Sequence, residues 1–447
     1  MMQSIWDVFE IPDLRRRVLY ALGAIAVYRV GAAVPIPGIN AEALRSLFEA
    51  HSNSLLGFLN IFSGGAMGRF SIFSMGVMPY INASIIISLL QGAHVIPYLD
   101  RLHKEGELGR RKLNQLTRYL TLFLAAFQSF GLTVAISKMP TPTGIPVVSN
   151  PTAWFYVVTV LTLTAGTIFV MWLGEQMTES GIGNGISLII FSGIVESIPG
   201  AALGLVQLVQ AEEVGLFAAL FLVAVVLAVV CSVVWVETAQ RKIPVQYAKR
   251  MVGRKMYGGA SSFLPLKVDQ SGVIAVIFAV SLLAVPVTVI QFTPNAPWAQ
   301  KVMEFSSSGN WMYQVLYAGL IIFFCYFYNS VSINPVDLAE NMKKSGGFIP
   351  GIRPGDPTSK YIEWILERIT LGGALFVAAV AVLPDYLKEV FNTPFYLGGT
   401  SLLICVGVAL DTMGQLEAHM IMRHYEGFLK KGRIKQRWFN VGTGGGT

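Results

Sequence analysis

Charge is scarce in this sequence. Charged residues make up 13% of the 447 residues, whereas hydrophobic residues make up 53%. A soluble globular domain carries about a quarter of charged residues. Cysteine is scarce as well: Cys231, Cys325 and Cys405 all lie inside apolar runs, where cysteine behaves as a small hydrophobic residue. The composition therefore indicates a membrane protein and favours neither a disulfide framework nor a metal bound by cysteine.

Common catalytic motifs are missing too. The sequence contains no HExxH, no GxSxG and no Gly-Lys dipeptide, which excludes a Walker-type nucleotide-binding loop. The glycine-rich stretch GIGNGIS at residues 181–187 has no preceding strand, so it favours tight helix packing or a bend over phosphate binding. We therefore expect no enzymatic activity and no cofactor, and we expect any driving force to come from outside the chain.

Ionisable residues are few inside the apolar runs. Proton- and ion-coupled transporters need such groups near the middle of the membrane, where they are costly and usually functional. Only Arg29 lies well inside a run, whereas Glu196, Asp385, Asp411 and Glu417 lie towards the ends of runs. This distribution argues against a coupled transporter.

Long apolar runs, in contrast, are abundant. A membrane-spanning helix needs roughly 20 residues at about 1.5 Å of rise per residue. We predict ten spans, three of them weaker because they contain Arg29, several glycines or a terminal aspartate. The ten are residues 18–34, 71–93, 119–137, 153–173, 180–195, 214–236, 271–292, 311–333, 369–384 and 395–410.

Positive charge is distributed unevenly between the two sides of these spans. With ten alternating spans, 27 of the 33 Lys and Arg residues fall on the side that holds both termini. Such a bias marks the cytoplasmic side of a membrane protein. We therefore expect a multi-pass protein whose N- and C-termini are both cytoplasmic.

Ten spans divide into two halves of five, and an odd number of spans per half inverts one half relative to the other. The predicted order is a cytoplasmic segment 1–17, an N-terminal half 18–200, an external linker 201–213, a C-terminal half 214–417 and a cytoplasmic tail 418–447.

The second span of each half shares two features. Each contains a proline, Pro79 or Pro286, and each begins near a Gly-Val pair, at residues 76–77 or 272–273. Helices broken at corresponding positions point to the central site of an inverted-repeat protein. We therefore expect these two helices to face each other across a moving seam.

The stretch 62–90, FSGGAMGRFSIFSMGVMPYINASIIISLL, differs in composition from a helix that only anchors a protein in the membrane. A glycine-rich half-turn with Arg69 precedes the span, and polar residues that include Asn82 and Ser84 lie within it. These features indicate a segment that lines a path and bends.

Ile81 and Ile85 are four residues apart, as are Ile186 and Ile190, so each pair shares one helical face. Isoleucine is common in membrane helices, and the spacing alone favours lipid or core contact. If the two faces converge, they form a narrow apolar constriction that seals a pore by dewetting.

Three loops on the predicted cytoplasmic side are long and basic: 100–117, 237–270 and 334–365. The second has a Gly-Gly break within its basic and apolar alternation, which predicts a hairpin-like protrusion. The third is stiffened by Gly and Pro around Arg353. Such loops either set topology alone or also bind acidic lipid or ribosomal RNA phosphate.

Seven motifs, in order along the chain, closely resemble the bacterial SecY family, the channel subunit of the general protein-export translocon. They are FSGGAMGRFSIFSMGVMPYINASIII, KEGELGRRK, WLGEQMTESGIGNGISLIIFSGIV, YAKRMVGRKMYGG, FLPLKVDQSGVI, NPVDLAENMKKSGGFIPGIRPG and PFYLGGTSLLI. The resemblance covers nearly the whole chain. It implies an all-α polytopic fold of the bacterial plasma membrane, with ten transmembrane helices in two inverted five-helix halves around a central pore.

The resemblance also implies a function and partners. The function is a protein-conducting channel that passes unfolded secretory polypeptides and releases hydrophobic segments laterally into the membrane, driven by an external motor or ribosome. The implied partners are the SecE and SecG subunits, the SecA motor ATPase, the ribosome with its RNA, preproteins that bear a signal peptide, and membrane lipid.

The same resemblance assigns roles to particular residues. It implies a pore ring formed by Ile81, Ile85, Ile186, Ile190, Ile277 and Ile404. It implies a plug, a short re-entrant helix that blocks the outer funnel, formed by Phe62, Ser63, Gly64, Gly65, Ala66, Met67, Gly68 and Arg69. It implies a lateral gate that includes Pro79, Asn82, Ser84, Gln128 and Pro286. It implies docking of the motor or ribosome at Arg254, Lys255 and Arg353.

Two other classes of protein compete with a channel. A secondary solute transporter with inverted repeats should have ionisable residues at mid-membrane. An insertase or scaffold of another family would lack the second mobile half.

Overall fold

The computed structural model describes residues 11–50, 60, 63–92, 96–138, 146–148, 151–212, 215–247, 250–252, 255–257, 261–290, 305, 310–391 and 399–439. Helices dominate these residues. The N-terminal group of helices comprises α2 (Pro12–Ala33), α3 (Ala41–Ala50), α5 (Met78–Gly92), α6 (Pro97–Lys104), α7 (Glu107–Lys138), α8 (Ala153–Ser180) and α9 (Gly185–Gln210). The C-terminal group comprises α10 (Leu216–Thr238), α11 (Val273–Ile290), α13 (Trp311–Ser332), α14 (Pro335–Lys344), α15 (Asp356–Phe391) and α16 (Gly399–Phe439).

Among the described residues, seven helices are long and apolar enough to cross a membrane. They overlap seven of the ten predicted spans and lie at residues 107–137, 153–180, 185–210, 216–238, 311–344, 356–384 and 399–422. The other three predicted spans coincide with α2, with the 15-residue helix α5 and with α11, which is apolar over 273–286. A helical membrane fold is therefore confirmed, whereas the number ten stays a prediction.

Two predicted boundaries differ from the structure. The span predicted to begin at Ser71 begins as helix only at Met78, because residues 72–77 form turns and Gly76 has a left-handed φ of +51°. Hydropathy does not distinguish such buried turns from helix. At the other end of this half, α9 continues to Gln210, so most of the predicted linker 201–213 is helical.

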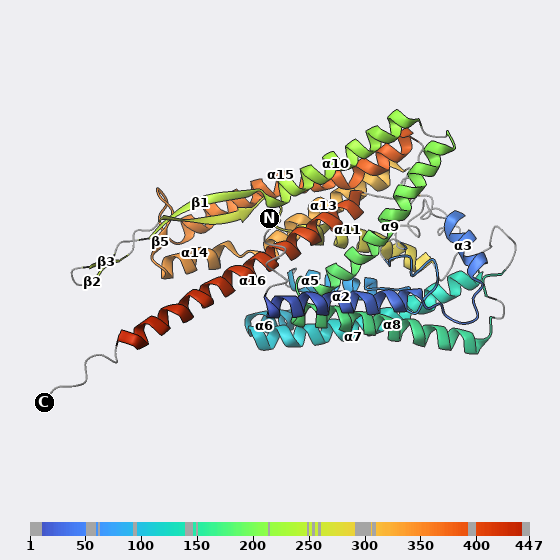
Figure 1. Cartoon of the computed structure of the whole chain (residues 1–447), viewed down its shortest axis with the longest axis horizontal. Helices are drawn as coiled ribbons and strands as arrows, with labels where there is room; N and C mark the ends of the chain where they lie inside the picture. The colour runs from blue at the N-terminus through green and yellow to red at the C-terminus, as the bar shows by residue number, and fades with distance from the viewer. Residues whose placement is uncertain are drawn as a thin grey trace.

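The two groups of helices meet along a seam. Within the N-terminal group α7 packs on α5 and α8, and within the C-terminal group α13 packs on α11 and α15. Across the seam, α5 and α7 contact α11, while α9 contacts α10 and α16. In Figure 1, α2, α5, α7 and α8 lie below, α10, α13 and α15 lie above, and α9 runs obliquely between them. The predicted contact between the two proline-bearing helices, α5 and α11, is confirmed.

Buried apolar side chains follow this arrangement. The largest cluster takes residues from both groups, with Tyr28, Ile190, Ile321 and Ile404 among its least accessible members. A second cluster, near α3, joins Leu44, Phe70 and Leu163 of the N-terminal group to Ala284 of α11. Packing of side chains rather than hydrophobic exclusion holds helices together inside lipid, so close contact within these clusters is what joins the two groups.

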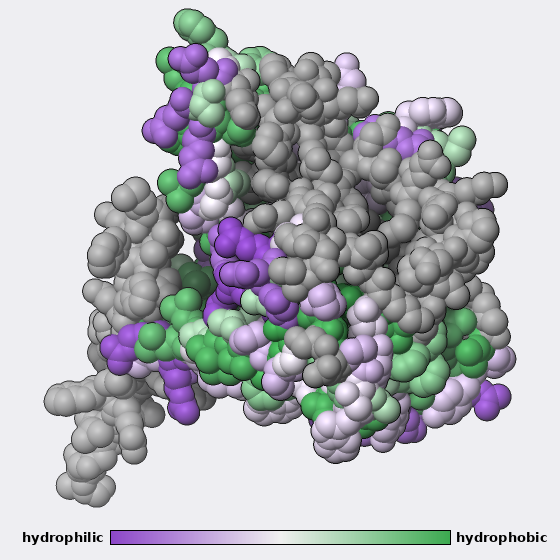
Figure 2. Space-filling model, turned by 90° about the vertical axis from the view of Figure 1, so that its right-hand side faces the viewer, coloured by the Kyte–Doolittle hydropathy of each residue, from purple (hydrophilic) through white to green (hydrophobic). Residues whose placement is uncertain are grey.

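Large apolar side chains also cover much of the outer surface. Phe217 on α10 is 88% exposed, and Leu216, Leu220 and Leu227 on the same helix are 62%, 59% and 60% exposed. Figure 2 looks at the α3 end and shows hydrophobic side chains reaching the surface beside paler ones, with strongly hydrophilic ones confined to separate patches. An exposed apolar surface of this extent is unfavourable in water and indicates contact with lipid.

A small sheet projects from the end of the molecule opposite α3 (Figure 1). Strand β1 (Gln240–Tyr247) pairs antiparallel with β4 (Ser261–Lys267), with Gln240 opposite Lys267, and β5 (Gly347–Phe348) adds to the other edge of β1. Strands β2 (Arg250–Val252) and β3 (Lys255–Tyr257) pair with each other farther along the chain. The predicted hairpin is therefore confirmed. Its base is anchored on α15 through a cluster that contains Ile243, Leu266 and Ile362.

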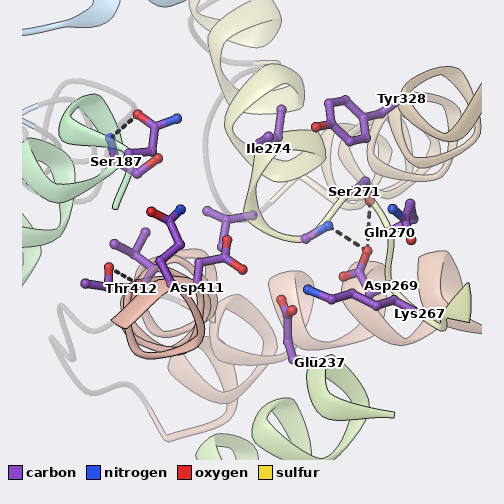
Figure 3. Close-up of a pocket in the computed structure, with 15 residues that line it drawn as sticks. Ser187, Glu237, Lys267, Asp269, Gln270, Ser271, Ile274, Tyr328, Asp411 and Thr412 are labelled. Carbon is purple, nitrogen blue, oxygen red and sulfur yellow. Dashed lines mark hydrogen bonds between the residues drawn. The ribbon is translucent and has the colours of Figure 1, made fainter. Parts of the chain in front are cut away.

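The first turns of α5 and α11 repeat one backbone feature. Gly76 and Gly272 both have φ of +51°, and each lies directly before the valine of its Gly-Val pair. The start of α11 is also held by Asp269, whose Oδ1 accepts hydrogen bonds from the Gly272 N–H at 2.8 Å and the Ser271 hydroxyl at 2.9 Å (Figure 3). The shared φ supports the inverted repeat, because a chance dipeptide match need not share a backbone conformation.

Asp269 provides a test of this helix start. Burial raises the pKa of its carboxyl group, and the two hydrogen bonds offset only part of that shift. Because the folded-state pKa lies above the unfolded one, this carboxyl favours folding most at low pH, and that contribution is lost as the pH rises through the folded-state pKa. Asp269→Asn keeps the accepting oxygen without the charge. We expect it to unfold at a temperature equal to or above that of the wild type at pH 7, and the gap to shrink at pH 4.

The matched control is Asp269→Ala, which removes the acceptor as well. Loss of such a cap costs about 1 kcal/mol, so this variant should unfold below the wild type at both pH values. Thermal unfolding in detergent measures all three proteins. If the Asn variant is as unstable as the Ala variant, the carboxylate charge rather than its oxygen holds the helix start.

Candidate functional site

The six isoleucines predicted to form a ring lie on four helices that line the seam. Ile81 and Ile85 lie on α5, Ile186 and Ile190 on α9, Ile277 on α11 and Ile404 on α16, so each group of helices supplies two helices. Five of them belong to the largest buried cluster and are at most 6% exposed; Ile186 is half-buried and packs against the same cluster. Side chains that are far apart in sequence thus converge at the seam.

These six side chains share one chemical property, which is that none can donate or accept a hydrogen bond. Water that enters a space lined only by such groups loses hydrogen bonds and gains none, so a narrow apolar constriction stays dry and blocks ions. Branched aliphatic side chains also bind passing polypeptide segments without preference. The cluster is therefore suited to sealing a path.

Close contact between α8 and α9 fixes the position of Ile186. A Cβ atom added at Gly174 would lie 2.9 Å from Ile186 Cγ1, and one added at Gly185 would lie 2.1 Å from the Gly174 carbonyl oxygen. The Gly185 N–H donates to the Thr178 hydroxyl at 2.9 Å, and Gly183 N–H donates to Gln415 of α16 at 3.0 Å. The prediction that the glycines of 181–187 serve tight packing is confirmed.

The segment predicted as the plug lies between α2 and α9. The Tyr28 hydroxyl donates to the Ser63 carbonyl at 3.0 Å, and Arg29 donates to the Gly64 carbonyl at 3.3 Å. The Ser74 hydroxyl donates to the Ala66 carbonyl at 3.0 Å, while the Met67 side chain is buried in the second apolar cluster. Phe62 lies outside the described residues.

The predicted helical form of this segment is wrong over its described part. Residues 63–70 form successive turns, and Gly64 and Gly65 have φ of +63° and +72°. A right-handed helix cannot include these left-handed conformations, which glycine adopts without steric cost. Side chains replace the missing helical hydrogen bonds: Asn60 Oδ1 accepts from Gly68 N–H at 2.6 Å, and Ser63 Oγ accepts from Met67 N–H at 3.1 Å.

The predicted gate residues lie on the helices that meet at the seam. Pro79 and Asn82 are buried and Ser84 is half-buried on α5, whereas Gln128 is buried on α7. Pro286, inside α11, is exposed. Because α5, α7 and α11 contact one another, the structure brings together the helices that carry these residues.

The predicted docking residues lie at the sheet end. Arg353 is exposed in the turn between β5 and α15, where its carbonyl accepts a hydrogen bond from the Thr358 hydroxyl at 2.8 Å. Lys255 lies in β3, and Arg254 falls outside the described residues. The exposed side chain of Arg353 thus projects from a turn that the Thr358 hydroxyl closes.

A pocket lies at the seam near the same end, lined by the start of α9, the end of α10, the start of α11 and α16. Figure 3 shows the side chains of Glu237, Lys267, Asp269 and Asp411 pointing toward one space. Three carboxyl groups and one ammonium group line this pocket, so acidic side chains outnumber basic ones there. No local sequence pattern indicates this grouping, because its members lie on separate helices and loops.

Sequence reasoning also missed a polar cluster around Arg29. Its guanidinium group pairs with the Glu196 carboxylate and donates to the Ser192 carbonyl, both on α9. Glu196 Oε1 also lies 3.9 Å from Arg69 Nη2. The separation of Arg29 and Glu196 by 167 residues conceals the pair from any local pattern. With its charge paired, Arg29 does not resemble the coupling site of a transporter.

Comparisons with known proteins agree with this geometry. The family model named SecY matches residues 71–413. Protein translocase subunit SecY of Aquifex aeolicus is 45% identical over 432 residues, which cover 96% of this chain and 100% of the relative. The SecY subunits of Escherichia coli strain K12 and Halalkalibacterium halodurans are 46% and 48% identical, over 95% and 96% of this chain and 95% and 100% of their own lengths.

Solved structures show the same fold at lower identity. A protein-conducting channel matches with a TM-score of 0.65 at 16% identity, over 91% of this chain and 93% of that chain. A SecY structure, described as having a plug domain that stabilises the closed state, gives a TM-score of 0.65 at 17% identity, over 91% and 92%. Sec61 from a canine ribosome–channel complex gives 0.60 at 15%, over 91% and 93%. By sequence and by fold, the chain belongs to the SecY family.

Proposed function

We propose that this chain is the channel subunit of a protein translocase. It passes unfolded secretory polypeptides across the bacterial plasma membrane and releases hydrophobic segments laterally into lipid. The observation that carries the proposal is that five of the six isoleucines belong to one buried apolar cluster at the seam and the sixth packs against it, with two helices of each group contributing. Family membership supplies the nature of the cargo, because the curated relatives are protein translocase subunits.

The proposed path runs between the two groups of helices. The six isoleucines form the seal, and the segment 63–69 with Phe62 forms the plug. The lateral gate is the contact of α5 and α7 with α11. The gate can open towards lipid because its apolar side chains then contact lipid tails instead of the apolar side chains of the facing helix. A hydrophobic segment that leaves through it gains about 0.8 kcal/mol for each CH₂ group buried.

The proposed partners act from the side that carries the sheet, the start of α2 and the end of α16. The excess of Lys and Arg predicted for this side supports a cytoplasmic location. Arg353 and the β1–β4 hairpin with Arg254 and Lys255 dock an external driving partner, the SecA motor or the ribosome. Solved relatives include a yeast Ssh1 complex bound to an 80S ribosome. SecE and SecG join as further subunits. The chain itself hydrolyses no nucleotide, in keeping with its lack of a Gly-Lys dipeptide.

The seal can be tested by removing ring side chains. Ile85→Gly combined with Ile190→Gly shortens the apolar lining on α5 and α9, so water can bridge the constriction. We expect ion conductance of vesicles that contain the resting channel to rise about tenfold or more, since wetting changes the ion barrier by at least ~1.4 kcal/mol.

The matched control replaces exposed residues of the same helices, Ile86 and Val195, both 38% exposed. Ile86→Gly with Val195→Gly carries the same helix-weakening cost of glycine and should leave conductance unchanged. Equal conductance for the two double variants would contradict the proposal that the isoleucines form the seal.

The docking site can be tested by reversing one charge. Arg353→Glu should abolish export driven by the SecA motor, measured as protease-protected preprotein in vesicles, because a carboxylate repels the acidic surface that the guanidinium would pair with. Lys360→Glu makes the same charge change at an exposed position on α15 and should retain export. Equal loss in both variants, or a lower unfolding temperature for Arg353→Glu alone, would contradict docking at Arg353.

A further inference from the structure

Glu196 occupies the centre of a charged cluster that joins three separate parts of the chain. Its carboxylate pairs with Arg29 of α2, and its Oε1 lies 3.9 Å from Nη2 of Arg69, at the end of the segment 63–69. Glu196 itself lies on α9. One carboxylate therefore serves two guanidinium groups.

Arg29 carries the connection onward to the other end of the segment. Beyond its pair with Glu196, the guanidinium donates to the Gly64 carbonyl at 3.3 Å and to the Ser192 carbonyl. Its side chain is 25% exposed, so most of the charge is withdrawn from water. A guanidinium in that position requires a counter-ion, because an uncompensated buried charge is strongly unfavourable.

The backbone of the segment is fitted into the space between α2 and α9. A Cβ atom added at Gly64 would lie 2.7 Å from Arg29 Nη1 and 3.0 Å from the Cα of Gly193. The neighbouring Ser63 carbonyl accepts the Tyr28 hydroxyl at 3.0 Å. The segment is thus held at residues 63–64 through α2 and at residue 69 through α9.

We propose that Glu196 is a latch that holds the segment 63–69 in its closed position, directly through Arg69 and indirectly by orienting Arg29 onto the Gly64 carbonyl. Apolar contacts of Met67 and Phe70 also hold the segment, but such contacts do not fix one position. The charge-assisted hydrogen bond from Arg29 to the Gly64 carbonyl does, because it needs a defined distance and direction. The ion pair of Arg69 with Glu196 adds attraction at the other end of the segment. The functional consequence rests on the proposed role of this segment as a plug.

Chemical accessibility tests the latch without reference to transport. The chain carries Met67→Cys in a background in which its three native cysteines are replaced by alanine. Labelling by a membrane-impermeant maleimide, added to the side of α3, then reports how often the buried residue 67 becomes exposed. Loss of one charge-assisted hydrogen bond shifts an opening equilibrium roughly tenfold, so Glu196→Gln should raise the labelling rate by at least about that factor.

Further variants separate the latch from general weakening of the fold. Arg69→Gln removes the direct contact but leaves Arg29 paired, so it should raise the rate by a smaller factor than Glu196→Gln. Its position, with a side chain 59% exposed, favours normal folding. Glu212→Gln makes the control substitution at the exposed end of the α9 region and should leave the rate unchanged. Unchanged labelling in both latch variants, or an equal rise in the control, overturns the latch.

Ion conductance of the same proteins in vesicles distinguishes the latch from the proposed function. Faster labelling together with raised conductance supports both the latch and the plug. Faster labelling at unchanged conductance supports the latch and shows that the segment 63–69 does not seal the path, which overturns its role as a plug.

Discussion

The interior of a bilayer offers no hydrogen-bond partners to backbone N–H and C=O groups, and this constraint governs where the chain departs from helix. The sheet lies at one end of the molecule, outside the long apolar helices (Figure 1). The turns of residues 63–77 are the informative exception. They are tolerated because protein surrounds them: the side chains of Asn60, Ser63 and Ser74 bond their backbone, and Tyr28 and Arg29 reach them from α2.

The seam between the two helix groups follows a different physical rule. Lipid tails are as apolar as leucine, so apolar side chains at the seam lose little when the helices part and lipid or another apolar helix takes their place. A seam built from Ile85, Ile277 and Ile404 can therefore open and close at small cost. Polar contacts across it, such as Gly183 N–H to Gln415, set which parts of the two groups stay together.

Much of the fold could be predicted from the sequence because spans and hairpins are local. Apolar runs predicted the long helices, and the alternation around the Gly-Gly break predicted the β1–β4 hairpin. The prediction that the six isoleucines lie together came from the family resemblance, because their spacing alone fits lipid contact equally well. The turns before α5 were missed because hydropathy is the same for a buried turn and a helix. The pairing of Arg29 with Glu196 was missed because it depends on how α2 packs on α9.

The charged cluster and the isoleucine cluster meet opposite requirements, which explains why they are separate. A constriction that many different segments pass must have no strong preference, and a charged group there would bind some segments and leave a water-filled path for ions. A segment that must return to one position needs directional bonds, which apolar contacts do not provide. Arg29 and Glu196 lie on α2 and α9 of the same helix group, so their bond survives when the two groups part. The directional element can thus hold the segment 63–69 to one group while the apolar seam opens.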